Sequence, residues 1–447
     1  MDDDQIYADI HEAFLFAYSL VASELGLLSW SNHATADYDG APINQIKLAK
    51  SVKDDGRSNG PNMETAYASA VLDLTAEPII VSKPAVEPDR YFGMLVTTAR
   101  GAVMEPLGTA GLGGQEVTTY AFVGPAYKGK LPKGVRQVKC TGNLAILAIR
   151  IREFPGVAND YATVDALQKK LDIRPLSAYR DANYVPPAGT VDPDLSYDPL
   201  EKKANISIVD FFNRYNRLTS SNPAEGEYTK LEARFRKYNI GAGKTFTLDG
   251  YGPELTARLN GIPQDFEEHF PEYAATYRLP AKDGWSVING DALEIGGDYN
   301  YRNAYYYYQP PSVNPPRICE YYSTKVDSDG NSLNGANRYR MHFEEGTLPG
   351  FKQGGFWSMV RYVGPLVTVP VNSTGRDTLN DSSPLAVGKD GSTDIYLQPE
   401  APTDAPESNW LPTSASDGDF TFTMRVYCPQ DSVVESGWVP PRLERIE

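Results

Sequence analysis

The stretch from Gly60 to Pro84 constrains the fold more than any other part of this 447-residue sequence. Two apolar runs, at 67–74 and 79–81, lie between clusters of glycine and proline residues. Short apolar runs with that punctuation are typical of buried β-strands. The stretch therefore predicts two neighbouring strands and makes a sheet the expected core of this part of the chain.

Similar runs recur at both ends of the chain, on either side of a region with helical spacing. The predicted strands lie at 43–48, 67–74, 79–81, 91–98, 118–123 and 144–151, and again at 338–343, 356–362, 366–371, 393–397 and 420–427. Apolar residues three and four positions apart predict helices at 4–25, 164–171, 206–218, 228–238, 254–259 and 265–277. Asp4 is expected to cap the first helix, Gly26 to end it, and Pro271 to break the last.

We therefore predict a mainly β protein of two jelly-roll or β-sandwich domains, with a helical insertion and an N-terminal helix. The predicted domains are 1–180 (an N-terminal β-sandwich), 181–283 (a helical linker) and 284–447 (a C-terminal jelly roll, beginning with a tyrosine-rich stretch at 299–308). The composition agrees, because 29 Tyr, 38 Gly and 34 Pro favour strands and turns.

Charge and cysteine content limit the partners and the compartment. A net charge of -16 argues against nucleic acid, because phosphate binding needs clustered lysines and arginines. Cysteines 140, 319 and 428 are odd in number and widely spaced, which favours a reducing compartment. The acidic residues 2–4 do not fit a signal peptide, and the apolar residues 13–30 contain a glutamate. We expect an acidic cytoplasmic protein with no membrane partner.

Several motifs together resemble the family that pairs domain of unknown function 1254 (N-terminal) with domain of unknown function 1214 (C-terminal). In the first half they are Glu12-Ala13-Phe14, Pro61-Asn62-Met63-Glu64-Thr65-Ala66-Tyr67, Leu72-Asp73-Leu74, Glu77-Pro78, Arg90-Tyr91, Val123-Gly124-Pro125 and Lys128-Gly129-Lys130-Leu131-Pro132. In the second half they are Gly284-Trp285, Asp329-Gly330, Arg338-Tyr339, His342-Phe343, Phe356-Trp357-Ser358, Asp390-Gly391-Ser392, Asn409-Trp410-Leu411-Pro412, Arg425-Val426-Tyr427 and Trp438-Val439-Pro440-Pro441. The resemblance implies two jelly-roll or sandwich domains, often oligomeric, with no agreed activity.

Four polar residues around the first strands form the first candidate site. Glu64 and Asp73 would be a catalytic carboxylate pair acting as general acid and base, as in glycoside hydrolysis. Asn62 and Arg90 would bind and orient the ligand. The alternative interpretation is structural: Asn62 caps a turn, Asp73 caps a strand end and Arg90 pairs with a carboxylate.

Aromatic residues form the second candidate site. Tyr305 and Tyr307 belong to the tyrosine-rich stretch, and their rings could stack on a flat ligand. The alternative is that this stretch is buried in the core or between subunits. His342 and Trp357 complete the predicted ligand-binding set, although a histidine in an alternating strand is commonly a hydrogen-bonded structural residue.

The sequence indicates neither a metal nor a cofactor. The four histidines form no pair at metal-binding spacing, and residues 327–331 fit a hairpin better than a calcium loop. Two functions stay open. The first is an oligomer-forming double jelly-roll protein with a structural, assembly or ligand-binding role, with itself as partner. The second is a metal-independent hydrolase or lyase that acts on a glycan or another polar small molecule. The sequence does not decide whether the protein is an enzyme.

Overall fold

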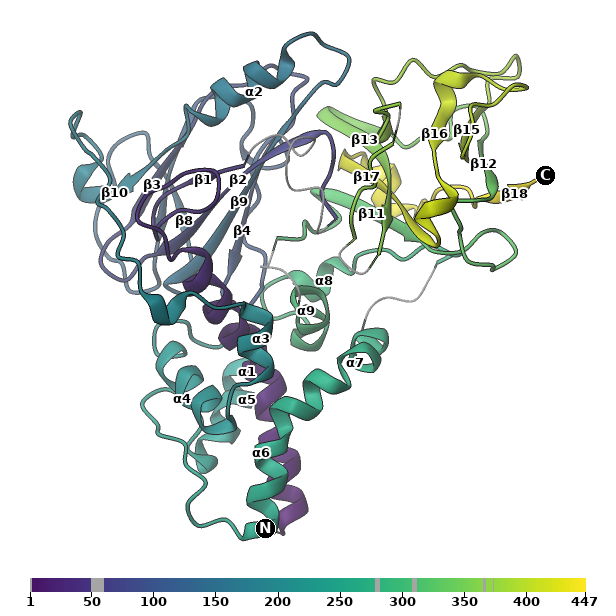
Figure 1. Ribbon diagram of the computed structural model, residues 1–447. Helices are drawn as coiled ribbons and strands as arrows, with labels where there is room; N and C mark the ends of the chain where they lie inside the picture. The colour runs from purple at the N-terminus through teal and green to yellow at the C-terminus, as the bar shows by residue number, and fades with distance from the viewer. Residues whose placement is uncertain (1, 50–59, 278–281, 308–311, 365–366, 373) are drawn as a thin grey trace.

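The computed structural model describes residues 2–49, 60–277, 282–307, 312–364, 367–372 and 374–447. Two β units lie side by side, and a group of helices lies below them in the view of Figure 1. Helices make up 28% of the structure and strands 26%. The coarse expectation of sheet-based units with an N-terminal helix is confirmed, but helices are as abundant as strands.

The first helix, α1, is longer than the sequence predicted. It runs from Asp3 to Trp30, and its N-cap is Asp2, whose side chain accepts a hydrogen bond from the Gln5 amide. The predictions of Asp4 as the cap and Gly26 as the stop are therefore wrong. A Cβ at Gly26 would lie 2.8 Å from the Trp30 ring, so the missing side chain gives that ring space against the helix.

The packing of α1 is that of a core helix. Its length and composition would allow it to cross a membrane, yet 72% of its most apolar window is buried within the chain. Glu24, which is buried in this helix, forms ion pairs with Arg214 and Arg217 at 2.9 and 2.7 Å. These contacts join α1 to the helix at Ile208–Leu218.

The other helices pack mainly around α1. They are α3 (Pro199–Ala204), α4 (Ile208–Leu218), α5 (Tyr228–Phe235), α6 (Pro253–Glu268), α7 (Phe270–Tyr277), α8 (Gly290–Leu293) and α9 (Tyr299–Tyr306). The helix predicted at 265–277 is divided at His269, just before Pro271, and its first part joins α6. The tyrosine-rich stretch, expected in a β region, forms α9 because Asp298 caps it and its rings stack one turn apart; Tyr308 lies outside the described residues.

The first β unit consists of two sheets around an apolar core. One sheet has the order β1-β2-β9-β4-β5-β6 and the other β10-β3-β7-β8. The strands are β1 (Lys47–Leu48), β2 (Thr65–Asp73), β3 (Ile79–Lys83), β4 (Phe92–Thr98), β5 (Leu107–Gly108), β6 (Leu112–Gly113), β7 (Thr118–Val123), β8 (Arg136–Lys139), β9 (Leu144–Arg152) and β10 (Asp172–Pro175). Helix α2 (Asp160–Gln168) adds Val164 and Leu167 to the core between the sheets.

The second β unit also consists of two sheets around an apolar core. Its sheets have the orders β11-β17-β13-β14 and β16-β15-β12-β18. The strands are β11 (Cys319–Thr324), β12 (Arg338–Phe343), β13 (Phe351–Val363), β14 (Thr378–Asn380), β15 (Thr393–Gln398), β16 (Trp410–Pro412), β17 (Phe420–Pro429) and β18 (Glu444–Ile446), with the short helix α10 at Asp431–Glu435. The strand predicted at 366–371 is limited to a single bridge at Thr368, and residues 365–366 are not described.

Candidate functional site

Glu64 and Asp73, the predicted carboxylate pair, lie at opposite ends of β2. Glu64 immediately precedes this nine-residue strand and Asp73 is its last residue. At the usual rise of a strand, they are roughly 30 Å apart. The Asp73 carboxylate accepts a hydrogen bond from the Thr75 amide at 2.9 Å, as expected of a strand-end cap. The structure therefore does not bring these two carboxylates together.

Asn62 and Arg90 make the contacts of the structural interpretation. The Asn62 side-chain oxygen accepts a hydrogen bond from the Glu64 amide at 2.8 Å, which closes a local turn. Arg90 is buried, and its guanidinium donates two hydrogen bonds to Asp160, at 2.6 and 3.0 Å. A further ion pair joins Arg90 to Glu87 at 2.7 Å. These contacts hold the first β unit together.

Glu64 lies fully buried where the two β units meet. Its Oε1 accepts hydrogen bonds from Thr378 and Asn380 of the second unit, both at 2.6 Å. Its Oε2 has no hydrogen-bond partner among the described residues. Burial raises the pKa of Glu64 to about 7, against the opposing effect of the two hydrogen bonds. Glu64 is therefore a buried carboxyl group with a raised pKa, and only one of its two oxygens accepts hydrogen bonds from described residues.

Arg152 crosses the same interface beside Glu64. Its Nη2 lies 2.6 Å from Oδ1 of Asp381, and its guanidinium lies over the rings of Phe154 and Phe356 at 4.7 and 4.4 Å. Burial raises the pKa of Asp381, although the ion pair with Arg152 favours the charged carboxylate. Because one ring comes from each unit, the arginine is held by both.

A second arginine attaches the Gly60–Glu64 segment to the second β unit. Arg425 on β17 donates hydrogen bonds to the main-chain oxygen of Gly60 at 2.8 Å and to the Tyr362 hydroxyl at 2.6 Å. That hydroxyl donates in turn to the main-chain oxygen of Pro61 at 2.6 Å. Polar and aromatic side chains therefore connect the two units. We call this interface the joint between the β units and interpret its role as structural.

The remaining predicted residues are dispersed. His342 on β12 is partly exposed and bonds Asp394 at 2.7 Å, a contact that raises the pKa of the histidine. Trp357 is buried in the core of the second unit. Tyr305 stacks on Tyr301, with ring centroids 4.6 Å apart. Of the predicted set, Tyr307 alone is among the residues that line the cavity described next.

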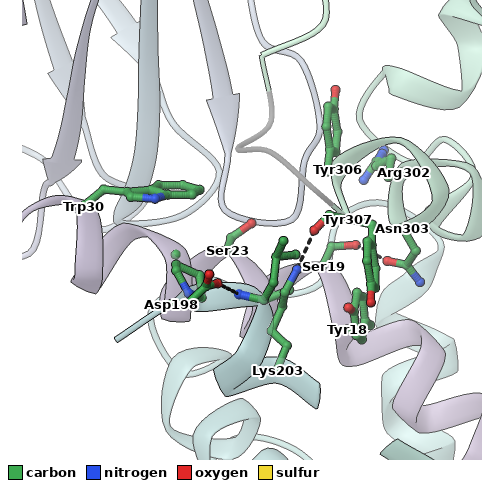
Figure 2. A pocket seen from close by; sticks show the side chains of 14 residues that line it. Tyr18, Ser19, Ser23, Trp30, Asp198, Lys203, Arg302, Asn303, Tyr306 and Tyr307 are labelled. Carbon is green, nitrogen blue, oxygen red and sulfur yellow. Dashed lines mark hydrogen bonds between the residues drawn. The ribbon is translucent and has the colours of Figure 1, made fainter. Parts of the chain in front are cut away.

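A cavity of about 140 Å³ lies between α1, α3 and α9 (Figure 2). We call it the Lys203 cavity. Its walls are mostly aromatic or small, with an amine, a guanidinium and the Asp198 carboxylate among them. The lining residues are Tyr18, Ser19, Ala22, Ser23, Gly26, Trp30, Asp198, Pro199, Leu200, Lys203, Arg302, Asn303, Tyr306 and Tyr307.

Lys203, in the last turn of α3, carries the most perturbed charge of the cavity wall. Its side chain is buried, and its Nζ donates a hydrogen bond of 2.5 Å to the main-chain oxygen of Tyr307, drawn in Figure 2. The amine also lies 4.5 Å from the centre of the Tyr307 ring. Burial lowers the pKa of Lys203 to about 8, although Glu267 and Asp198 act in the opposite direction.

Arg302 is a less available cation than Lys203. Its guanidinium donates to the main-chain oxygens of Ala292, Arg100 and Glu294. It also lies 3.8 Å from the Glu225 carboxylate. These contacts direct most of its donors into the protein, so the amine of Lys203 is the better candidate to meet a ligand.

Two of the three tyrosines that line the cavity share one carboxylate. The hydroxyls of Tyr18 and Tyr307 both donate to Glu267 on α6, and their rings stack with centroids 6.4 Å apart. Burial raises the pKa of Glu267. On the other side, Ser19 donates to Asn303, whose amide donates to the main-chain oxygen of Leu15. The cavity wall is therefore held by hydrogen bonds between distant segments.

Sequence reasoning did not identify Lys203, Tyr18, Glu267 or Arg152. Lys203 follows Lys202 in a polar segment, and that pattern is typical of a solvent-exposed helix end. Arg152 closes an apolar strand and gives no sign of the partner it reaches. The tyrosine-rich stretch was the one signal that pointed to the cavity, through Tyr307.

The fold is similar to that of a solved bacterial protein. A crystal structure of a Vibrio parahaemolyticus protein superimposes with a TM-score of 0.71 at 20% identity, over 99% of this chain and 100% of that one. A crystal structure of an uncharacterized protein from Burkholderia cenocepacia gives a TM-score of 0.45 at 13% identity, over 98% and 88%. The first likeness shows a common fold. No curated protein matches the chain significantly.

Two family models match the chain, one in each β unit. Residues 43–175 match the model described as Protein of unknown function (DUF1254), and residues 319–431 match the one described as Protein of unknown function (DUF1214). The first match covers β1 to β10 and the second covers β11 to β17. The resemblance drawn from the sequence is thereby confirmed: this chain carries the pairing of an N-terminal DUF1254 region with a C-terminal DUF1214 region.

Proposed function

We propose that this protein binds a small molecule with a carboxylate or carbonyl group in the Lys203 cavity. The observation that carries the proposal is a buried amine at the wall of an aromatic-lined cavity. An ammonium has three N–H donors, and among the described residues one acceptor, the oxygen of Tyr307, lies within hydrogen-bond distance. Because burying an unpaired charge is unfavourable, a ligand oxygen is the partner that this amine lacks.

The size of the cavity limits the ligand. Its volume of about 140 Å³ is close to that of engineered cavities that hold one benzene molecule. A ligand of up to about nine non-hydrogen atoms fits that space, and a sugar chain does not. Within the predicted partners, this favours a small polar ligand over a glycan.

A catalytic role for Glu64 and Asp73 as a pair draws no support from their positions at opposite ends of β2. We therefore place the binding role at Lys203 and treat Glu64 as part of the joint between the β units. The hydrolase alternative would need another pair of groups, close enough to act on one bond.

Calorimetric titration of the purified chain tests the binding role. The probes are acetate, pyruvate, glyoxylate and benzoate at millimolar concentration. We expect saturable binding of at least one probe to the wild type and to Lys202→Met, and at least about tenfold weaker binding to Lys203→Met, because a lost charged hydrogen bond costs about 1.5–3 kcal/mol. Lys202 is the matched control because it is exposed and adjacent. Equal binding to Lys203→Met, or no saturable binding of any probe, would overturn the proposal.

We also propose a jelly-roll arrangement of the β units and, separately, self-association of the chain. The non-sequential strand orders in both β units support the jelly-roll form. Self-association has weaker support, since Tyr301, Tyr305 and Tyr307 contact other rings within the chain. Light scattering at micromolar concentration checks it: a mass of one chain would count against assembly.

A further inference from the structure

We propose that Lys203 is a carbonyl-reactive amine that forms an imine with an aldehyde or ketone bound in the Lys203 cavity. The inference rests on the proposed binding function of the cavity and adds a covalent step to it. Three features of the site support it: access of the amine to the cavity, its fixed position, and its electrostatic environment.

Access comes from the position of Lys203 on α3. The residue is 6% exposed overall, yet it lines the cavity together with Tyr18 and Tyr307. Figure 2 shows its side chain reaching from α3 toward Tyr307. A small carbonyl compound in the cavity would therefore meet the amine beside the ring of Tyr307.

The contacts of the amine hold it in position without pairing it with a carboxylate. Its hydrogen bond runs to a main-chain oxygen, which accepts the hydrogen bond but carries no charge to neutralise the ammonium. Among the described residues, no carboxylate lies within ion-pair distance of Nζ. The ring of Tyr307, 4.5 Å away, favours the cation without binding it covalently. The nitrogen can therefore turn toward a bound carbonyl carbon once it is deprotonated.

The electrostatic environment makes deprotonation accessible near neutral pH. Burial lowers the pKa of Lys203 to about 8, which leaves about one amine in ten neutral at pH 7. A lysine at its usual pKa is neutral about 300 times less often. Desolvated lysines of this kind are the usual nucleophiles of imine-forming sites.

The reaction is balanced by the amine and the carbonyl alone. The nitrogen lone pair attacks the carbonyl carbon, one amine hydrogen moves to the carbonyl oxygen, and a carbinolamine results. Loss of the second amine hydrogen together with the hydroxyl group then gives the C=N bond and one water molecule. No oxidant, reductant or metal is consumed in the step.

Lys83 is a natural internal control. Burial lowers its pKa to about 8 as well. However, its Nζ donates to the main-chain oxygens of Pro84 and Glu116, at 3.2 and 2.5 Å, and it does not line the Lys203 cavity. A comparison of the two lysines therefore separates the effect of the cavity from the effect of a lowered pKa.

The test is reductive trapping followed by peptide mass spectrometry. The full chain is incubated separately with pyruvate, glyoxylate and benzaldehyde at pH 7.5, reduced with sodium cyanoborohydride and digested. We expect at least one probe to label Lys203 about tenfold or more above Lys83 and Lys202, and we expect excess benzoate to suppress that label. Lys203→Arg, which keeps the charge, should lose the label while keeping its melting temperature.

The outcomes distinguish this inference from the binding function on which it rests. Calorimetric binding without a trapped product at Lys203 for any probe would overturn the imine step and leave the binding site intact. Neither binding nor trapping would overturn both. Equal labelling of Lys203 and Lys83 would also overturn the inference, because reactivity would then follow the lowered pKa and not the cavity.

Discussion

Arg152 of the first β unit and Asp381 of the second form an ion pair across their interface, with Nη2 and Oδ1 2.6 Å apart. The arginine side chain is 3% exposed and the aspartate 16%. The pair lies beside Glu64, whose carboxylate accepts hydrogen bonds from the second unit. The orientation of the two β units thus depends on charged groups that water hardly reaches.

Removing one partner of this ion pair should destabilise the protein strongly. Asp381→Asn leaves Arg152 buried without its counter-charge, and we expect a loss of about 3 kcal/mol in the free energy of unfolding. Urea titration followed by circular dichroism measures it. Asp165→Asn is the control, because Asp165 and its partner Lys169 are 39% and 59% exposed. That exposed pair should change stability by less than about 1 kcal/mol. Similar losses in both variants would contradict the structural role of the buried pair.

Glu64 should make stability fall as the pH rises through neutrality. Burial raises its pKa from the usual 4.5 to about 7 in the folded protein, so folding favours the protonated acid. Its contribution is fully present below pH 4.5 and is lost as the pH rises through about 7, a change of about 3 kcal/mol. Arg152 and Asp381 are the charged groups that face it, and they act in opposite directions.

Glu64→Gln tests this pH dependence because glutamine resembles the protonated acid. Unfolding free energies between pH 4.5 and 7.5 should fall less steeply with pH in the variant than in the wild type. Glu227→Gln, at a carboxyl group that is 95% exposed, is the control and should follow the wild-type curve. Parallel curves for Glu64→Gln and the wild type would contradict this account, because they would show that folding does not shift the pKa of Glu64.

Lys203 should reduce stability at neutral pH, as functional groups in buried sites commonly do. Its folded pKa is about 8 against a usual 10.5, so the unfolded chain holds the proton more tightly. The penalty is complete below pH 8 and disappears as the pH rises to 10.5, and its size is about 3 kcal/mol. Lys203→Met should therefore raise the unfolding free energy at pH 7, with the difference shrinking by pH 10. An unchanged or lowered stability at pH 7, measured beside Lys202→Met, would contradict this account.

His342 and Asn62 should not affect binding in the Lys203 cavity. His342 lies on β12 and bonds Asp394, and Asn62 bonds Ser358 at the joint between the units. Neither residue lines the cavity. We expect His342→Ala to bind the calorimetric probes within about twofold of the wild type, and Asn62→Ala to do so while losing about 1 kcal/mol of stability. A tenfold loss of affinity in either variant would place the ligand elsewhere.

The local structure of this protein follows from its sequence where the pattern is long and regular. The alternation at 420–427 predicted β17, and the helical spacing at 206–218 predicted α4, because one face of each element must be buried. The motifs also predicted the family pairing. The tyrosine-rich stretch was misread, since aromatic residues favour strands, and the cap at Asp298 together with the contacts of α9 outweighed that preference.

Which side chains meet was decided by the tertiary structure alone. Glu64 bonds Asn380, 316 positions away, and Lys203 bonds Tyr307, 104 positions away. Periodicity determines which face of an element is buried, but it does not determine which other face covers it. The partner depends on how the sheets and helices pack against one another in three dimensions. That packing placed Glu64 at the interface between the β units and Lys203 at the wall of a cavity.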